Sequence, residues 1–347
     1  MKSKIAIISL LGIFLYSSHL QAQYVSTKVK SKHQQYTDSL KQVEYNYIFP
    51  ILGQGAYKKG FDIPYPVGLM GNYMWMDQGL TIDNLQLGLK TDELDIPLTG
   101  VDFVEFGKNT NTSYTFNVRP DVWVFPFLNV YGIFGYGESH TEVNLTAPIE
   151  MKSVVDQSIS TVGVGIMGAG GIGPVWVSVD ANWTWNKPEL LDKAVRVNVL
   201  GIRVGHTFVF KNRPQSNIAL WAGAMSVKMN SETNGEIKLS EAIPGLEDRA
   251  AGIASDYDDW YVLNYDALKP AQKLAVDNVI DPLVDKIREV DGSAIIRYGI
   301  DKQVKERWNG LIGIQYQYNK HWMLRSEAGL IGDRKSFLLS LNYRFLL

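Results

Sequence analysis

The sequence predicts an all-β fold, a transmembrane antiparallel β-barrel of about 12 strands within a range of roughly 10 to 14. Apolar and polar residues alternate with a period of two in many segments, and Gly, Asn and Pro separate these segments. This pattern is typical of membrane strands, because successive side chains point to opposite faces and only one face meets lipid. Beyond the N-terminus no run of about 20 apolar residues occurs, which excludes a helical membrane bundle.

The composition excludes several classes of protein. The chain of 347 residues contains no cysteine, so disulfides and thiolate metal sites are excluded. It has 34 basic and 36 acidic residues, and a nucleic-acid partner is not expected because such proteins carry a basic excess. Neither a cofactor nor a metal is predicted. The 9 Trp and 18 Tyr suit the aromatic girdles of a barrel.

The N-terminus, residues 1–22, is predicted to be a signal peptide. Lys2 and Lys4 precede an apolar run over residues 5–16, and Ala22 ends a plausible cleavage site. A membrane anchor is the alternative, but the run is short for one. Residues 23–66 are rich in charge, Pro and Gly, and are expected to form an N-terminal periplasmic segment or a plug in the lumen.

Residues 67–347 are predicted to form the barrel. The first three strands are expected at 67–76, 80–89 and 99–106, with a turn at residues 77–79. The clearest hairpin follows at 114–124 and 129–136, and further strands are predicted at 161–168, 175–185, 195–210 and 218–229. In the strand over 195–210 the apolar face changes from odd to even positions, which predicts a bulge. Trp183 and Trp185 are expected in an interfacial girdle.

The closing strands are predicted at 308–318, 322–330 and 337–347. In the last one, Phe337, Leu339, Leu341, Tyr343, Phe345 and Leu347 share one face. An apolar strand at the chain end would be a sticky edge in a soluble protein, whereas in a barrel it pairs with the first strand. This ending resembles the C-terminal strand of Gram-negative outer-membrane β-barrel proteins, although Leu346 and Leu347 follow the aromatic Phe345.

The resemblance points to no functional family. It implies a location in the cell outer membrane, contact with outer-membrane lipids, and insertion by the barrel assembly machinery. With the C-terminus on the periplasmic side, the turns near Pro126, Gly171, Arg213 and Lys320 are periplasmic and mostly short. The connections on the other side, over residues 141–158, 186–193 and 231–307, are mostly longer. The longest, residues 231–307, shows helical spacing and is expected to be an external helical loop that covers the pore mouth or packs on itself.

The inward positions carry mixed charges and amides. The predicted pore-lining residues are Asn117, Arg119, Asp121, Asp180, Asn182, Arg203, Arg325, Glu327 and Arg344, with Asn342 beside them. Such residues line an aqueous path or fill a narrow lumen as a paired network. The first functional hypothesis is therefore a passive pore for small polar solutes. The second is a structural or adhesion barrel with a filled lumen.

An outer-membrane lipid-processing enzyme is the third hypothesis. Ser139 and His140 lie beside Glu138 and Glu142, but neighbours on a strand point to opposite faces, so no catalytic residue is assigned. Asp256, Asp258 and Asp259 lack the spacing of a calcium loop. The Gly-rich run over residues 168–173 precedes a strand rather than a helix, so it predicts a turn and not a dinucleotide site.

Overall fold

The computed structural model describes residues 30–148, 150–191, 193–229 and 232–346. The predicted signal peptide and Leu347 lie outside the described residues. Among those residues, no helix combines the length and the apolar character needed to cross a membrane.

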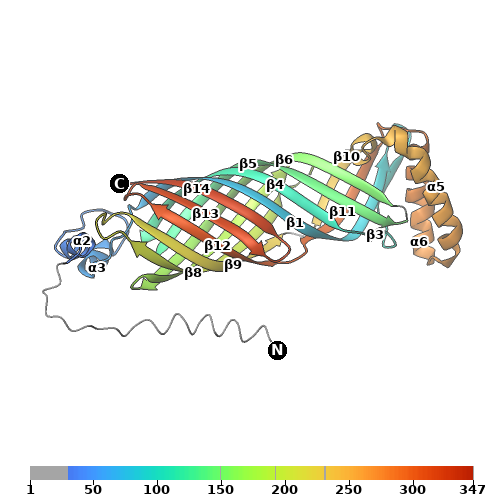
Figure 1. Ribbon diagram of the computed structural model, residues 1–347. Coiled ribbons are helices and arrows are strands. Elements are labelled where there is room, and N and C mark those ends of the chain that lie inside the picture. The colour runs from blue at the N-terminus through green and yellow to red at the C-terminus, as the bar shows by residue number, and fades with distance from the viewer. Residues whose placement is uncertain (1–29, 149, 192, 230–231, 347) are drawn as a thin grey trace, which may run out of the picture. The chain divides into compact units, whose positions relative to one another are not determined.

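Within the described chain, ten antiparallel strands close into a barrel (Figure 1). They are β1 (Val67–Lys90), β4 (Asn109–Phe125), β5 (Leu128–Ala147), β6 (Met151–Ile172), β7 (Val175–Pro188), β8 (Val195–Val209), β9 (Asn217–Met229), β12 (Trp308–Gln317), β13 (Trp322–Ile331) and β14 (Lys335–Phe345). Closure is made by β1, which pairs with β14 from Val67 opposite Phe345 and with β4 from Val67 opposite Val122. The predicted pairing of the last strand with the first is confirmed.

The number of barrel strands lies at the lower end of the predicted range, because two of the expected strands do not belong to the wall. Residues 80–89 continue β1 instead of returning: Asp77, Gln78 and Gly79 stay in register with β4, so the chain does not reverse there. Residues 99–106 contribute only to β2 (Asp95–Gly100) and β3 (Glu105–Phe106), outside the closed ring.

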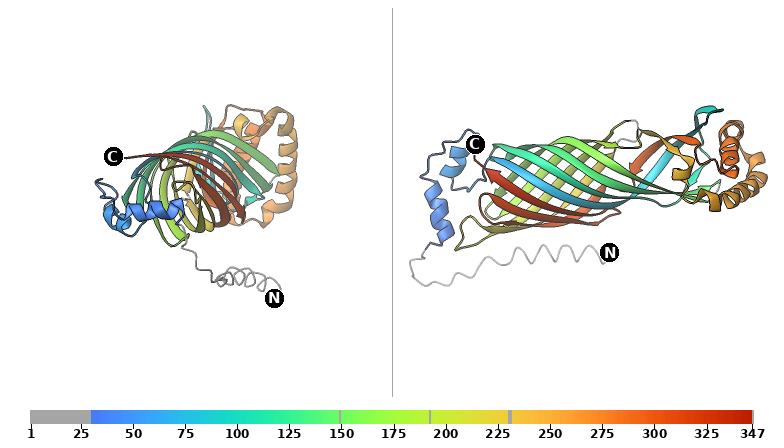
Figure 2. Two further views of the ribbon diagram at one scale, coloured as in Figure 1. Left: turned by 60° about the vertical axis from the view of Figure 1, so that its left-hand side comes forward. Right: turned by 90° about the horizontal axis from the view of Figure 1, so that it is seen from above.

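One end of the barrel, called here the proximal end, carries the starts and ends of the closing strands. Val67 and Phe345 lie there, together with the turns after β4, β6, β8 and β12. These turns are short, as the sequence predicts. The other end, called the distal end, carries the long connections after β1 and β9 (Figure 2). The long connection predicted over residues 141–158 is wrong, because β5 and β6 stay paired as far as Leu145 and Met151.

The wall has an apolar outer face and a polar inner face. Phe116, Val204 and Ile312 are each more than half exposed, whereas Asn129, Ser340 and Asn342 on the inner face are 1% exposed. A lipid-facing wall needs this arrangement because hydrocarbon cannot hydrogen-bond to polar groups.

The bulge expected in β8 is absent, since its ladders with β7 and β9 run without a shift. Val195 and Val197 instead face inward near the distal end, opposite Asn186 and Thr184 of β7. Val199 faces inward as well. Val227, opposite Val199, is buried there.

The distal half of β1 extends beyond the closed ring, and the strands that pair with it there belong to the same sheet. This half of β1 pairs with β11 (Ile295–Val304) and with β2, while β10 (Glu232–Lys238) pairs with β11. The connection between β10 and β11 forms α4 (Leu239–Ala242), α5 (Leu246–Asn264), the 3₁₀ turn η1 (Tyr265–Ala267), α6 (Pro270–Ala275), the π-helical turn η2 (Val276–Ile280) and α7 (Asp281–Arg288). We call residues 80–108 and 232–304 the distal subdomain.

The distal subdomain has an apolar core of its own. Leu239, Val276 and Leu89 are fully buried in it, and they come from a helix, the π-helical turn and β1 respectively. Asp281-Pro282 starts α7, as proline at a first helical turn allows. The long connection therefore folds into a subdomain whose helices pack against strands β1, β10 and β11.

Residues 32–66 lie at the proximal end and contain α2 (Lys32–Leu40) and α3 (Gly53–Lys58). The amide of His33 donates to the carbonyl of Lys211, and the amide of Ile51 donates to the carbonyl of Val124. These bonds attach the segment, called the proximal cap, to the turns of the barrel.

Candidate functional site: the filled lumen

All nine predicted pore-lining residues lie on strands of the barrel and face its interior. Asn117, Arg119 and Asp121 come from β4, Asp180 and Asn182 from β7, Arg203 from β8, Arg325 and Glu327 from β13, and Arg344 from β14. The structure brings most of them together as ion pairs rather than leaving them around an open path.

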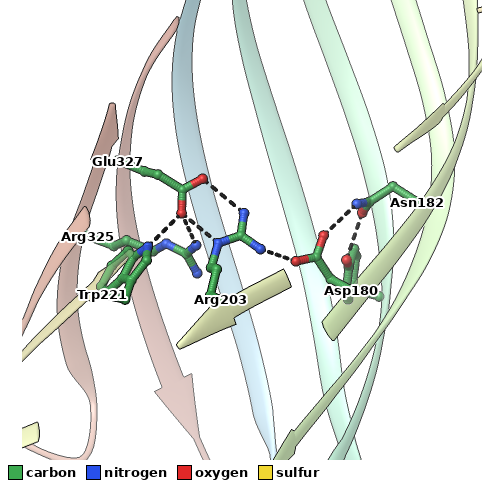
Figure 3. Close-up of polar contacts among 7 residues, drawn as sticks. Asp180, Asn182, Arg203, Trp221, Arg325 and Glu327 are labelled. Atoms are coloured by element: carbon green, nitrogen blue, oxygen red, sulfur yellow. Dashed lines mark hydrogen bonds and ion pairs between the residues drawn. The ribbon is translucent and has the colours of Figure 1, made fainter. Parts of the chain in front are cut away.

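Arg203 is the centre of the main network (Figure 3). Its Nε and Nη2 donate to the two carboxylate oxygens of Glu327 at 2.7 and 2.9 Å, and its Nη1 pairs with Asp180. The Arg203 side chain is 9% exposed. A buried bidentate guanidinium–carboxylate pair is fixed in geometry, and this one bridges β8 and β13 across the lumen.

Glu327 is held by further donors. Trp221 Nε1 on β9 donates to it at 2.9 Å, and Arg325 Nη2 donates at 2.8 Å. The Arg325 guanidinium also lies 4.8 Å from the Trp221 ring centroid, within cation–π range. The carboxylate therefore accepts hydrogen bonds from three side chains, those of Arg203, Trp221 and Arg325.

The network continues towards β5. Asn182 Nδ2 donates to Asp180 at 3.0 Å, and the Tyr131 hydroxyl donates to Asn182 Oδ1 at 2.7 Å. The guanidinium of Arg119 in turn stacks on the Tyr131 ring, with its Cζ 4.1 Å from the ring centroid. Tyr131 and Trp221 were not among the predicted residues, because an aromatic at an inward position gives no sign of a hydrogen-bonding role.

A second ion pair lies nearer the proximal end. Arg344 Nη2 donates to Asp121 at 2.9 Å, and Asn129 Nδ2 donates to the same carboxylate oxygen at 2.7 Å. Arg344 also binds the carbonyls of Tyr65 and Pro66, where the proximal cap joins β1. The last strand is thus fixed to the start of the first by a side chain as well as by its ladder.

A third cluster of polar side chains lies towards the distal end, and its central residue, Arg334, was not predicted from the sequence. Arg334, between β13 and β14, is 1% exposed and donates to Gln78 at 3.0 Å and to the carbonyl of Glu306 at 3.3 Å. Asn309 binds the carbonyls of Ile331 and Arg334. Asn117 accepts a bond of 2.7 Å from Asn72. The sequence places Arg334 in a loop, which gave no reason to expect burial.

A cavity of about 630 Å³ lies between the lumen network and the proximal cap. Arg119, Arg325 and Asn342 form part of its wall in the barrel, and residues 60–64 of the cap lie on its other side. The predicted periplasmic segment or plug therefore lies against the mouth of the lumen.

Lys320 holds the cap to the turn between β12 and β13. Its Nζ lies 2.8 Å from Asp62, and the rings of Tyr36, Tyr57 and Tyr65 lie between 5.6 and 5.9 Å away. Burial alone would lower the pKa of Lys320, but the Asp62 carboxylate outweighs it and raises that pKa above its ordinary value. Burial raises the pKa of Tyr36 to about 12. Both groups therefore keep their paired forms at neutral pH.

The residues considered for catalysis do not form a triad. His140 Nδ1 lies 2.6 Å from Asp156 on the outer face, where both side chains are exposed. Ser139 is buried on the inner face and accepts a bond from Asn111. Asp256, Asp258 and Asp259 lie on α5, where Asp258 pairs with Arg288. The Gly-rich run forms the end of β6 and its turn, as predicted. No cluster of three or more His, Asp or Glu that suits a metal occurs in the described ranges.

A closed barrel with an apolar outer wall and a polar lumen is the architecture of outer-membrane proteins. The chain is an outer-membrane β-barrel. No family model and no curated relative matches its sequence.

Several solved structures are similar to this barrel at low identity. The β domain of the Bordetella autotransporter BrkA is 11% identical, with 81% of this chain and 100% of that chain covered and a TM-score of 0.32. OprG from Pseudomonas aeruginosa is 8% identical over 82% and 100%, with a TM-score of 0.34. The toluene transporter TbuX from Ralstonia pickettii is 7% identical over 81% and 90%, with a TM-score of 0.30.

Proposed function

We propose that the barrel is a closed membrane anchor that presents the distal subdomain to a partner outside the cell. The observation that supports a closed lumen is the Arg203 network, which joins β8 to β13 through Glu327 and reaches β7 through Asp180. A barrel of about eight strands is filled by its side chains, whereas open channels belong to barrels of about 16 strands. A barrel of ten strands is close to the filled limit.

Energetics favours a lumen that stays closed. Opening a path would separate Arg203 from two carboxylates in a water-poor interior, and breaking a buried pair costs about 3–5 kcal/mol. The distal subdomain supplies the rest of the argument, because its independent core lets it fold into a defined surface rather than a loose loop.

Single-channel recording in planar bilayers tests the closed lumen. We expect no conductance steps from the wild-type barrel. The matched variant replaces Asp180, Arg203, Arg325 and Glu327 by Ser, which removes two charges of each sign, and it should conduct. This variant also shows that the protein inserts and that the assay detects an open lumen.

Wild-type steps as large as those of the variant would contradict the anchor and support the passive pore for small polar solutes. Protease treatment of intact cells tests the second half of the proposal. Cleavage within residues 246–290 should occur from outside, and protection of this region in cells with an intact outer membrane would contradict presentation of the subdomain.

A further inference from the structure

The cavity at the proximal end is lined by charges that do not balance. Its wall and the adjoining network contain the cations Arg119, Arg203, Lys320, Arg325 and Arg344 and the carboxylates Asp62, Asp121, Asp180 and Glu327. Each carboxylate already has a cationic partner. With the histidines counted as neutral, one positive charge is left over.

The surplus charge belongs to Arg119. It appears in none of the ion pairs among the described residues, and its guanidinium stacks on the neutral ring of Tyr131. Its Nε is buried without a hydrogen-bond partner, and the Nε of Arg325, on the same wall, is in the same condition. Because a partly buried guanidinium without a counter-ion is costly, the charge of Arg119 favours an anion beside it.

The remaining wall is suited to an apolar group. Met70, Met167 and Met323 line the cavity together with Trp123. Thioether side chains are flexible and polarisable, so they adapt to ligands of differing shape. The volume of about 630 Å³ lies within the range of small-molecule sites. A ligand with one anionic group and an apolar body would satisfy both parts of the wall.

We propose that this cavity binds a small organic monocarboxylate, with the carboxylate on Arg119 and the apolar body against the methionines. The inference goes beyond the anchor function, because a closed lumen needs no ligand. The proximal cap covers the site, since Gly60, Phe61 and Ile63 lie along its outer side. A ligand can therefore enter from the proximal end, and its entry does not require the central network to open.

Isothermal titration calorimetry on the full chain, folded in uncharged detergent, tests the proposal. The probes are benzoate, its neutral analogue benzyl alcohol, and inorganic phosphate. We expect benzoate to bind at least tenfold more tightly than benzyl alcohol, because a hydrogen bond to a charged group contributes about a factor of ten or more. Phosphate should bind more weakly than benzoate, since it leaves the methionine wall unfilled.

Arg119→Gln should weaken benzoate binding at least tenfold and leave benzyl alcohol unchanged. Arg196→Gln is the control, because Arg196 is an exposed arginine on β8 and does not line the cavity. Equal binding of benzoate and benzyl alcohol to the wild type would overturn the proposal. Binding of phosphate with no preference for benzoate would overturn the carboxylate assignment.

Methyl NMR on the wild-type protein gives a readout that does not depend on the variant folding. The resonances of Met70, Met167 and Met323 should shift on addition of benzoate, while those of methionines outside the cavity stay in place. Each resonance is assigned by a Met→Leu change. A titration that moves none of the three would contradict the site.

Discussion

The barrel and the distal subdomain have opposite distributions of polarity, although one strand, β1, belongs to both. In the barrel, apolar residues such as Phe116 face outward and ionised residues such as Arg203 are buried. In the distal subdomain, Val276 and Leu239 are buried, and residues 239–291 carry twelve acidic and five basic residues on the surrounding helices. The comparison shows that the surrounding solvent, lipid or water, decides which side chains a chain buries.

Loss of the central cation should have the largest effect. Arg203→Met should destabilise the barrel by about 3–5 kcal/mol, because Asp180 loses its ion-pair partner and Glu327 loses its bidentate one. Urea unfolding in lipid vesicles, followed by heat-modifiable gel mobility, measures this change. Arg196→Met, on the outer side of the same strand, is the control and should stay within about 0.5 kcal/mol. Similar losses in both variants would show that the network contributes little.

Truncation of a side chain in the apolar core should have the second-largest effect on stability, and the effect should be confined to the distal subdomain. Leu239 is fully buried, so Leu239→Ala leaves a cavity in the core. We expect it to lower the unfolding free energy of the subdomain by about 3 kcal/mol. Hydrogen exchange should show faster opening of α5 and α7, with unchanged exchange in the barrel. Leu274→Ala, at a position 61% exposed, should change neither. Faster exchange throughout the barrel would mean that the two regions unfold as one.

The same type of charge insertion should act differently in the two regions. Ile312→Lys, on the lipid-facing side of β12, should cost about 2–3 kcal/mol because the cation enters hydrocarbon. Leu263→Lys, on α5 at a position 80% exposed, should cost nearly nothing. Unfolding free energies in vesicles measure both. A comparable cost for the two would contradict the assignment of the barrel's outer wall to lipid.

The smallest expected effect is a loss of stability of the distal subdomain at alkaline pH. Burial, together with the bond that the Tyr257 hydroxyl donates to Asp281, raises the pKa of Tyr257 above its ordinary value. A raised tyrosine pKa contributes stability that is complete below about pH 10 and is lost at higher pH, by up to about 1.4 kcal/mol per pH unit. Tyr257→Phe should remove this part of the slope. An unchanged slope between pH 10 and 11 would exclude Tyr257 as its cause.

The sequence allowed most of the barrel to be predicted, because a lipid-facing wall imposes a period of two on each strand. It did not show that β1 continues past Gly79. That continuation depends on β11, whose Asp301 lies opposite Asp83 but far along the chain. A local pattern cannot distinguish a glycine in a turn from a glycine in a ladder when the deciding partner is so distant.

The residues of the lumen were predictable one by one, but their pairing was not. Alternation places Arg203 and Glu327 inside, whereas their contact joins positions 124 residues apart across the barrel. Trp221 and Tyr131 complete the network through one polar atom each. A hydropathy pattern counts both as aromatic residues and gives no sign of this hydrogen bonding. Arg334 was missed because loop residues carry no period.

The length of β1 has a mechanical consequence. This strand of 24 residues is bonded along its proximal half to β4 and β14, and along its distal half to β2 and β11. A pull on the distal subdomain therefore reaches the membrane wall as shear along hydrogen-bonded ladders, with no flexible tether in between. Many backbone hydrogen bonds of β1 would have to break at once. The strand would therefore transmit force from the distal subdomain to the barrel wall with little extension.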